Sequence, residues 1–138
     1  MRKRSLAREY AVQALYNSDI IERPASQLLD SIFDMEGVPD SEVVDFAKYL
    51  VQLVDEHKEE IDRIISKFAS NWPLDRMAVV DRNILRLGSA ELLYAQDIPP
   101  KASINEAVEL AKKFGEEDAY RFVNGILDRI RKELCPTK

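Results

Sequence analysis

Residues 41–68 read SEVVDFAKYLVQLVDEHKEEIDRIISKF, and apolar side chains recur in this stretch at alternating steps of three and four. That spacing places one apolar side chain per turn along one side of an α-helix. The positions of this seam are Ala47, Leu50, Val54, His57, Ile61, Ile64 and Phe68. The seam is either one continuous helix or two helices with a break at its polar residue, His57, and its length favours the break.

The same helical pattern extends in both directions. The chain has only four glycines, its six prolines stand at expected helix ends, and β-branched alternation is scarce. We expect further helices over about residues 3–17, 25–35, 76–95, 104–114 and 116–134. Ser41 and Ser103 are expected to cap two of the helices, Ser103 in a capping box with Glu106. The sequence therefore predicts an all-α fold of about seven helices.

Trp72-Pro73-Leu74 marks the main boundary, because proline ends helices. We expect one domain over residues 1–138, built from an N-terminal bundle (about residues 1–70) and a C-terminal bundle (about residues 71–138). Trp72, the sole tryptophan, is expected to fill the gap between the bundles.

Motifs that carry catalysis or bind a cofactor are absent from the sequence. It has no glycine-rich phosphate loop, no HExxH, no Gly-x-Ser-x-Gly and no metal-binding spacing of Cys and His. One cysteine, Cys135, and one histidine, His57, provide neither a disulfide nor a metal cluster. No run of 18 apolar residues is present. We expect a cytoplasmic protein that is not an enzyme, binds no cofactor or metal, and does not associate with membranes.

The N-terminus is basic, although the chain has a net charge of −5. Residues 2–16 contain four basic residues and one acid, whereas residues 19–62 contain 13 acids and 3 bases. Residues 63–138 contain 11 acids and 13 bases. A positive end on an acidic protein indicates an anionic partner, with RNA or DNA the commonest; the alternative is a solvated terminus.

Three motifs resemble the family of bacterial transcription antitermination factors called NusB. They are REYAVQALY at residues 8–16, DRNILRL at residues 81–87 with Glu91-Leu92 after it, and IPPKASINEAVELAKKFG at residues 98–115. The third motif continues as FVNGIL at residues 122–127 and is the most specific of the three. The same domain resembles the N-terminal part of some ribosomal RNA methyltransferases; without a methyltransferase domain in the sequence, we expect the free-standing factor.

This resemblance implies a fold and a function. NusB-like proteins consist of two helical bundles, and bind boxA, a short single-stranded RNA element of nascent transcripts, together with NusE, a ribosomal protein of the small subunit. With NusA and NusG they join RNA polymerase and suppress termination, notably in ribosomal RNA operons. Members occur as monomers and as dimers, so a monomer and a homodimer are both compatible with the resemblance. The alternative function is a helical protein–protein adaptor without RNA specificity of its own.

The resemblance also implies the sites. The expected RNA-binding residues are Arg2, Lys3, Arg4, Arg8, Tyr16, Arg86, Phe114, Asp118, Arg121 and Phe122. Arginine binds phosphate, aromatic rings stack on unpaired bases, and a carboxylate can accept from a base amino group. Core packing is the alternative role for Phe114, Phe122 and Tyr16. The expected contacts to NusE are Asp81, Arg82 and Leu85.

Overall fold

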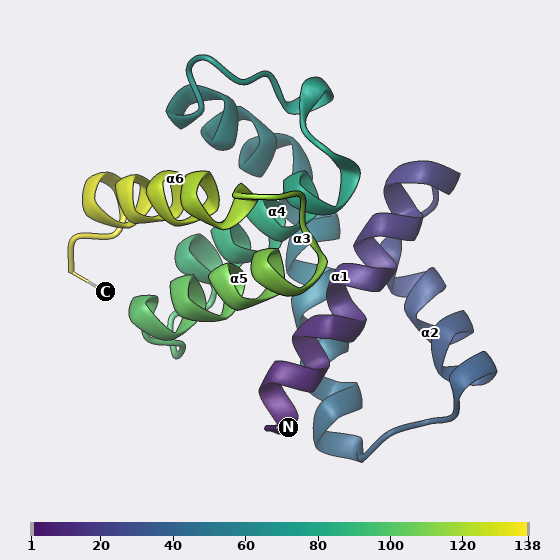
Figure 1. The fold of residues 1–138 in the computed structure, drawn as a ribbon. Coiled ribbons are helices and arrows are strands. Elements are labelled where there is room, and N and C mark those ends of the chain that lie inside the picture. The colour runs from purple at the N-terminus through teal and green to yellow at the C-terminus, as the bar shows by residue number, and fades with distance from the viewer. Residues whose placement is uncertain (1, 138) are drawn as a thin grey trace. The chain divides into compact units, whose positions relative to one another are not determined.

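A computed structural model describes residues 2–137, and within this range it is helical without any β-strand (Figure 1). Every predicted helix is present, but the helices predicted from about residues 76 and 116 begin at Val79 and Ala119. The elements are α1 (Lys3–Ile21), α2 (Ala25–Glu36), α3 (Ser41–Phe68), the 3-10 helix η1 (Leu74–Arg76), α4 (Val79–Tyr94), α5 (Pro100–Phe114) and α6 (Ala119–Leu134). No helix in the described part of the chain has the length and apolar character needed to cross a membrane.

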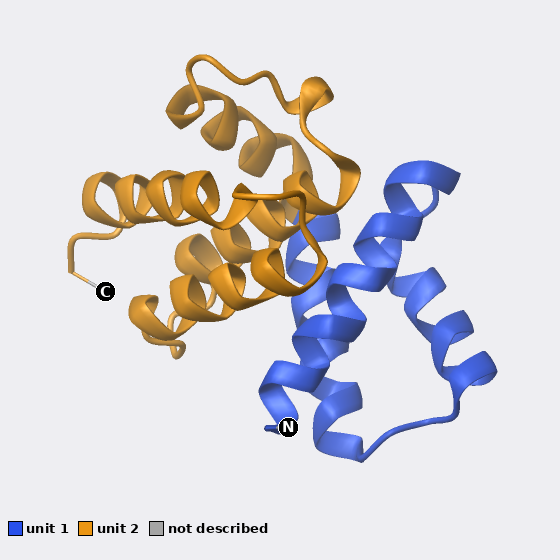
Figure 2. Ribbon diagram, in the orientation of Figure 1, with its two compact units in different colours: residues 1–56 blue, residues 57–138 orange. Residues whose placement is uncertain are grey.

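The chain forms two compact units, residues 1–56 and residues 57–138 (Figure 2). The boundary lies inside α3 and before the position near residue 70 where the sequence placed it. At this boundary His57 has non-helical dihedral angles (φ −123°, ψ 17°), so the predicted break in the seam is confirmed. Beyond the break Ile65, rather than the predicted Ile64, is fully buried. The His57 ring stacks on Tyr94, with 3.8 Å between ring centroids.

In the first unit, small side chains let α1 pack closely against α2. Ala7, Ala11 and Ala14 recur along α1 and are fully buried. Both carboxylate oxygens of Asp55, on α3, accept from the backbone N–H groups at the start of α2, at 3.1 Å each. They satisfy donors that the helix itself leaves unpaired. Asp40, rather than Ser41, caps α3, because its Oδ1 accepts from the Glu42 N–H at 2.9 Å.

In the second unit, α4 packs against both α5 and α6. Nearly every side chain from Asp81 to Leu92 is buried, which agrees with the prediction that this helix is central. Gly88 allows the close approach: a Cβ atom there would lie 2.7 Å from Cδ1 of Leu127 on α6. The remainder of α3 is joined to α4 by polar contacts, described below.

The predicted capping box at Ser103 is wrong. α5 begins at Pro100, one residue after Pro99, and proline is well suited to a first helical position because it has no N–H group to leave unpaired. Ser103 therefore lies inside the helix, where its hydroxyl donates to Oε1 of Glu91 on α4 at 2.8 Å. At this position, a serine that caps a helix and a serine that contacts a neighbouring helix occur in the same local sequence pattern.

Two glycines offer a matched test of this packing. Gly125→Ala on α6 is expected to raise the free energy of unfolding by about 1 kcal/mol, because a Cβ there meets no atom within 4 Å and alanine favours the helix. Gly88→Ala should bring no such gain, because fully buried Leu127 must repack, at a cost of about 1–3 kcal/mol. Urea unfolding followed by circular dichroism measures both. Equal shifts for the two variants would contradict the close crossing at Gly88.

Candidate nucleic-acid interface

The basic residues of the first unit are only partly available to an anion. Lys3 pairs with Asp40 at 3.3 Å and with Glu42 at 3.4 Å, and these carboxylates raise its pKa. The Arg4 guanidinium lies over the ring of Phe46, 4.4 Å from its centroid. Arg4 and Lys3 remain exposed, as do Arg2 and Tyr16. These four side chains form the accessible part of the predicted N-terminal site.

Arg8 differs from the other predicted basic residues because it is only 3 % exposed. Its guanidinium lies 5.3 Å from the centroid of the same Phe46 ring. A cation over an aromatic face is attracted by the ring quadrupole, so Arg8 stabilises the packing of α1 on α3. The structure therefore gives Arg8 a packing role and does not favour the expected phosphate contact.

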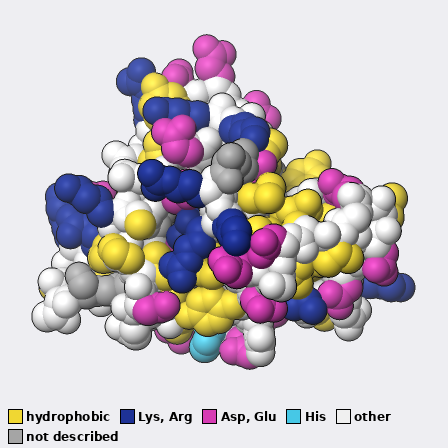
Figure 3. Space-filling model, turned by 90° about the horizontal axis from the view of Figure 1, so that it is seen from below, with side chains coloured by type: hydrophobic (Ala, Val, Ile, Leu, Met, Phe, Trp, Pro, Cys, Tyr) yellow, Lys and Arg dark blue, Asp and Glu magenta, His cyan; other side chains and the backbone are white. Residues whose placement is uncertain are grey.

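On the face drawn in Figure 3, positive charge does not form a uniform surface. Figure 3 shows Lys and Arg side chains interspersed with Asp and Glu side chains and with hydrophobic side chains. Attraction of an anion by such a surface depends on individual arginines rather than on a broad positive field.

The second unit brings four predicted RNA-binding residues together around the junction of α5 and α6. Phe114 ends α5 and is 44 % exposed, with Lys113 over its ring. Asp118, the residue before α6, adopts a left-handed conformation (φ 65°) and pairs with Arg121 at 3.5 Å. The Arg121 side chain is 73 % exposed. Phe122 is half-buried, as expected for a ring that both packs and presents an edge to solvent.

One aromatic residue near this junction was missed as a candidate. Trp72 stacks on Phe122 with 5.2 Å between ring centroids and 19° between ring planes. It is 49 % exposed, so it is not the buried plug that the sequence predicted. The two residues are far apart in sequence, and no local pattern reveals that they meet.

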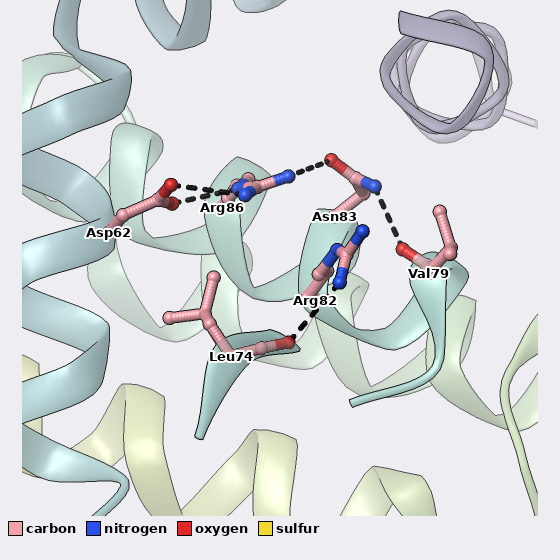
Figure 4. A network of polar contacts seen from close by, with 6 residues as sticks. All are labelled: Asp62, Leu74, Val79, Arg82, Asn83 and Arg86. Atoms are coloured by element: carbon pink, nitrogen blue, oxygen red, sulfur yellow. Dashed lines mark hydrogen bonds and ion pairs between the residues drawn. The ribbon is translucent and has the colours of Figure 1, made fainter. Parts of the chain in front are cut away.

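Arg86 lies inside a polar network rather than on the surface (Figure 4). Its Nε and Nη2 donate to the two carboxylate oxygens of Asp62, on α3, at 2.7 and 3.0 Å. Its Nη1 donates to Oδ1 of Asn83 at 3.0 Å, and the Asn83 amide donates to the Val79 carbonyl at 2.8 Å. This bidentate geometry is the strongest that arginine makes with a carboxylate. The structure thus favours a role in joining α3 to α4 over the expected phosphate contact.

The residues expected to contact NusE are mostly internal as well. Leu85 is fully buried, and Asp81 is nearly so. Oδ1 of Asp81 accepts from the Glu116 N–H at 3.4 Å, and burial raises the pKa of the Asp81 carboxyl. A Cβ on Gly115 would lie 2.5 Å from the same oxygen, so glycine is required beside it. Arg82 is half-buried, and its Nη1 lies 3.4 Å from the Leu74 carbonyl oxygen of η1.

No group of His, Cys, Asp and Glu side chains within residues 2–137 is arranged to hold a metal ion. The candidate site therefore consists of arginines, aromatic rings and one exposed carboxylate, Asp118. These are the groups that bind phosphates, stack on unpaired bases and read base edges. Fold and site together define the class: an all-helical protein whose exposed groups suit single-stranded nucleic acid.

Comparison with known proteins identifies the family. The sequence model of the NusB family matches residues 5–132. The transcription antitermination protein NusB of Myxococcus xanthus is 47 % identical over 137 residues, which cover 97 % of this chain and 98 % of that protein. The NusB protein of Bacillus subtilis is 44 % identical over 132 residues, covering 96 % and 97 %. The chain belongs to the NusB family.

Solved structures agree with this membership. T. maritima NusB is 36 % identical and superposes with a TM-score of 0.86, covering 96 % of this chain and 92 % of that one. A structure of antitermination factors NusB and NusE in complex with dsRNA contains a chain that is also 36 % identical, with a TM-score of 0.86 and coverage of 96 % and 98 %. The predicted fold class and family are thereby confirmed.

Replacing Arg86 separates its two candidate roles. Arg86→Ala is expected to lower the free energy of unfolding by about 2–4 kcal/mol, because it leaves the Asp62 carboxylate and the buried Asn83 carbonyl oxygen without their partner. Arg82→Ala, which shortens a half-buried side chain whose contact with the Leu74 carbonyl is long, is the control and should cost less than Arg86→Ala. Denaturant unfolding measures both. A stable Arg86→Ala variant with weakened RNA binding would instead support the phosphate contact.

Proposed function

We propose that this protein is an RNA-binding transcription antitermination factor that binds boxA single-stranded RNA together with NusE. The observation that carries the proposal is the cluster of Phe114, Asp118, Arg121 and Phe122 at the α5–α6 junction of a NusB-family chain. Rings there are placed to stack on bases, and Arg121 is exposed for phosphate. The relative whose structure contains both NusE and RNA supports the same pairing.

Proposed RNA contacts occur in each of the two units. From the first unit come Arg2, Lys3, Arg4 and Tyr16, which are exposed. From the second come the four residues of the α5–α6 junction. Arg8 and Arg86 act indirectly, because each is held inside its own unit by Phe46 or by Asp62. Base discrimination then falls to Asp118 and Phe122, since arginine–phosphate contacts carry no sequence information.

Burial leaves few of the residues proposed to contact NusE accessible to a partner. Arg82 is the member of the predicted set with accessible surface, whereas Asp81 and Leu85 shape the helix that presents it. In the cell we expect the complex to act with NusA and NusG on RNA polymerase in the cytoplasm, without an enzymatic activity of its own.

A salt titration with RNA tests this function. Affinity for a boxA-like RNA should exceed that for a scrambled RNA of equal length, and NusE should increase the difference. Arg121→Ala should reduce the slope of log K against log salt by about 0.7, the value for one phosphate contact on a single strand. Lys48→Ala is the control, because Lys48 is exposed but pairs with Asp30 and lies outside the proposed site.

The second candidate function, an adaptor without RNA specificity, is favoured by one observation: Lys3 is already bound by two carboxylates. It predicts equal affinity for boxA-like and scrambled RNA, both with and without NusE. That result, together with a NusE complex that forms normally, would overturn the RNA-binding proposal.

A further inference from the structure

The Trp72 side chain of the second unit is 49 % exposed, so about half of its surface is available to a partner. Its backbone N–H donates to the Ala69 carbonyl at 2.9 Å, and Pro73 follows, so its backbone position is well defined. Phe122 covers one side of the ring in a stacked arrangement. An exposed ring that adjoins a second ring offers a surface on which an unpaired base can stack. Because Trp72 is already held on one side, stacking on its other side costs little conformational entropy.

Two cations lie over the ring of Phe68, in the segment that leads to Trp72. Arg129, on α6, donates through Nη1 to the Phe68 carbonyl at 2.9 Å, and its guanidinium lies over the Phe68 ring. Lys67 lies over the same ring, 5.6 Å from its centroid. Both side chains reach Phe68, four residues before Trp72, and both are exposed. Arginine has five N–H donors, of which the Phe68 carbonyl takes one, so Arg129 retains donors for phosphate.

Gly125 provides an independent observation. It lies inside α6, four residues after Arg121 and four before Arg129, so the three share one side of the helix. Nothing lies within 4 Å of a Cβ placed there, so the packing of this unit does not require glycine. Glycine inside a helix is unfavourable and is used where another backbone approaches closely. A nucleic-acid backbone that crosses α6 between Arg121 and Arg129 would account for the glycine.

We propose that the side of Trp72 facing away from Phe122 stacks on one unpaired base of the bound RNA, whose backbone passes over Gly125 between Arg121 and Arg129. This inference rests on the proposed RNA-binding function and extends its site from Phe122 along α6. The eight residue steps from Arg121 to Arg129 span about 12 Å of helix axis. The neighbouring cations favour RNA over an apolar protein segment as the occupant.

The sole tryptophan of the chain reports directly on this stacking. Titration of the protein with boxA-like RNA should quench Trp72 fluorescence along the same binding curve as the anisotropy of dye-labelled RNA. Trp72→Leu should weaken binding about five-fold or more, the loss of one base stack, whereas Trp72→Phe should stay within two-fold of the wild type. Leu134→Ala is the control: it alters an exposed apolar side chain at the end of α6 and should leave binding unchanged.

A second variant guards against effects on folding. Gly125→Gln fills the open space with a neutral, helix-compatible side chain, and should weaken RNA binding without lowering the thermal midpoint. Intact binding by Trp72→Leu with no quenching in the wild type would overturn the inference while leaving RNA binding in place. Loss of NusE affinity alone would make the Trp72 surface a protein contact and also overturn it. If the wild-type protein with NusE does not distinguish boxA-like from scrambled RNA, the proposed function itself fails.

Discussion

A bidentate ion pair between Arg86 and Asp62 constrains how the helices of the second unit pack. It joins α3 to α4, and α4 packs against α5 and α6. Arg86 is almost fully buried, so without Asp62 its charge would be costly, and Asn83 satisfies a further donor. The pair therefore fixes which side of α4 faces α3. The orientation of α4 in turn decides where α5 and α6, with their exposed rings, are placed.

The residues of the three family motifs, together with Arg121 beside the third motif, divide into two groups. One group holds the helices together: Arg8 over Phe46, Arg86 with Asp62, Asp81 beside Gly115, and Ser103 with Glu91. The other group is exposed and available to a partner, as Arg121 and Phe114 are. The motif residues of this chain therefore include the support for the surface as well as the surface itself.

Local patterns in the sequence predict the helices well, because apolar spacing, prolines and glycines act over a few residues. They predicted the break at His57 and the central position of α4. They failed where the partner is distant in sequence. Ser103 looks like a cap until Glu91 is seen beside it. The RNA contact that the family resemblance implied for Arg86 is likewise not favoured once Asp62 is seen beside it. Trp72 was expected to fill the gap between the bundles. Its stacking on Phe122 has no local signal in the sequence.

Photocrosslinking tests the central claim, that the α5–α6 junction binds single-stranded RNA, most directly. A boxA-like RNA carrying 5-iodouracil at single positions would be irradiated with the protein and NusE, and the crosslinked peptides identified by mass spectrometry. The account predicts crosslinks to aromatic residues of the second unit, Phe122 foremost, that unlabelled boxA-like RNA competes away and scrambled RNA does not. Crosslinks confined to NusE, or equally removed by scrambled RNA, would contradict it.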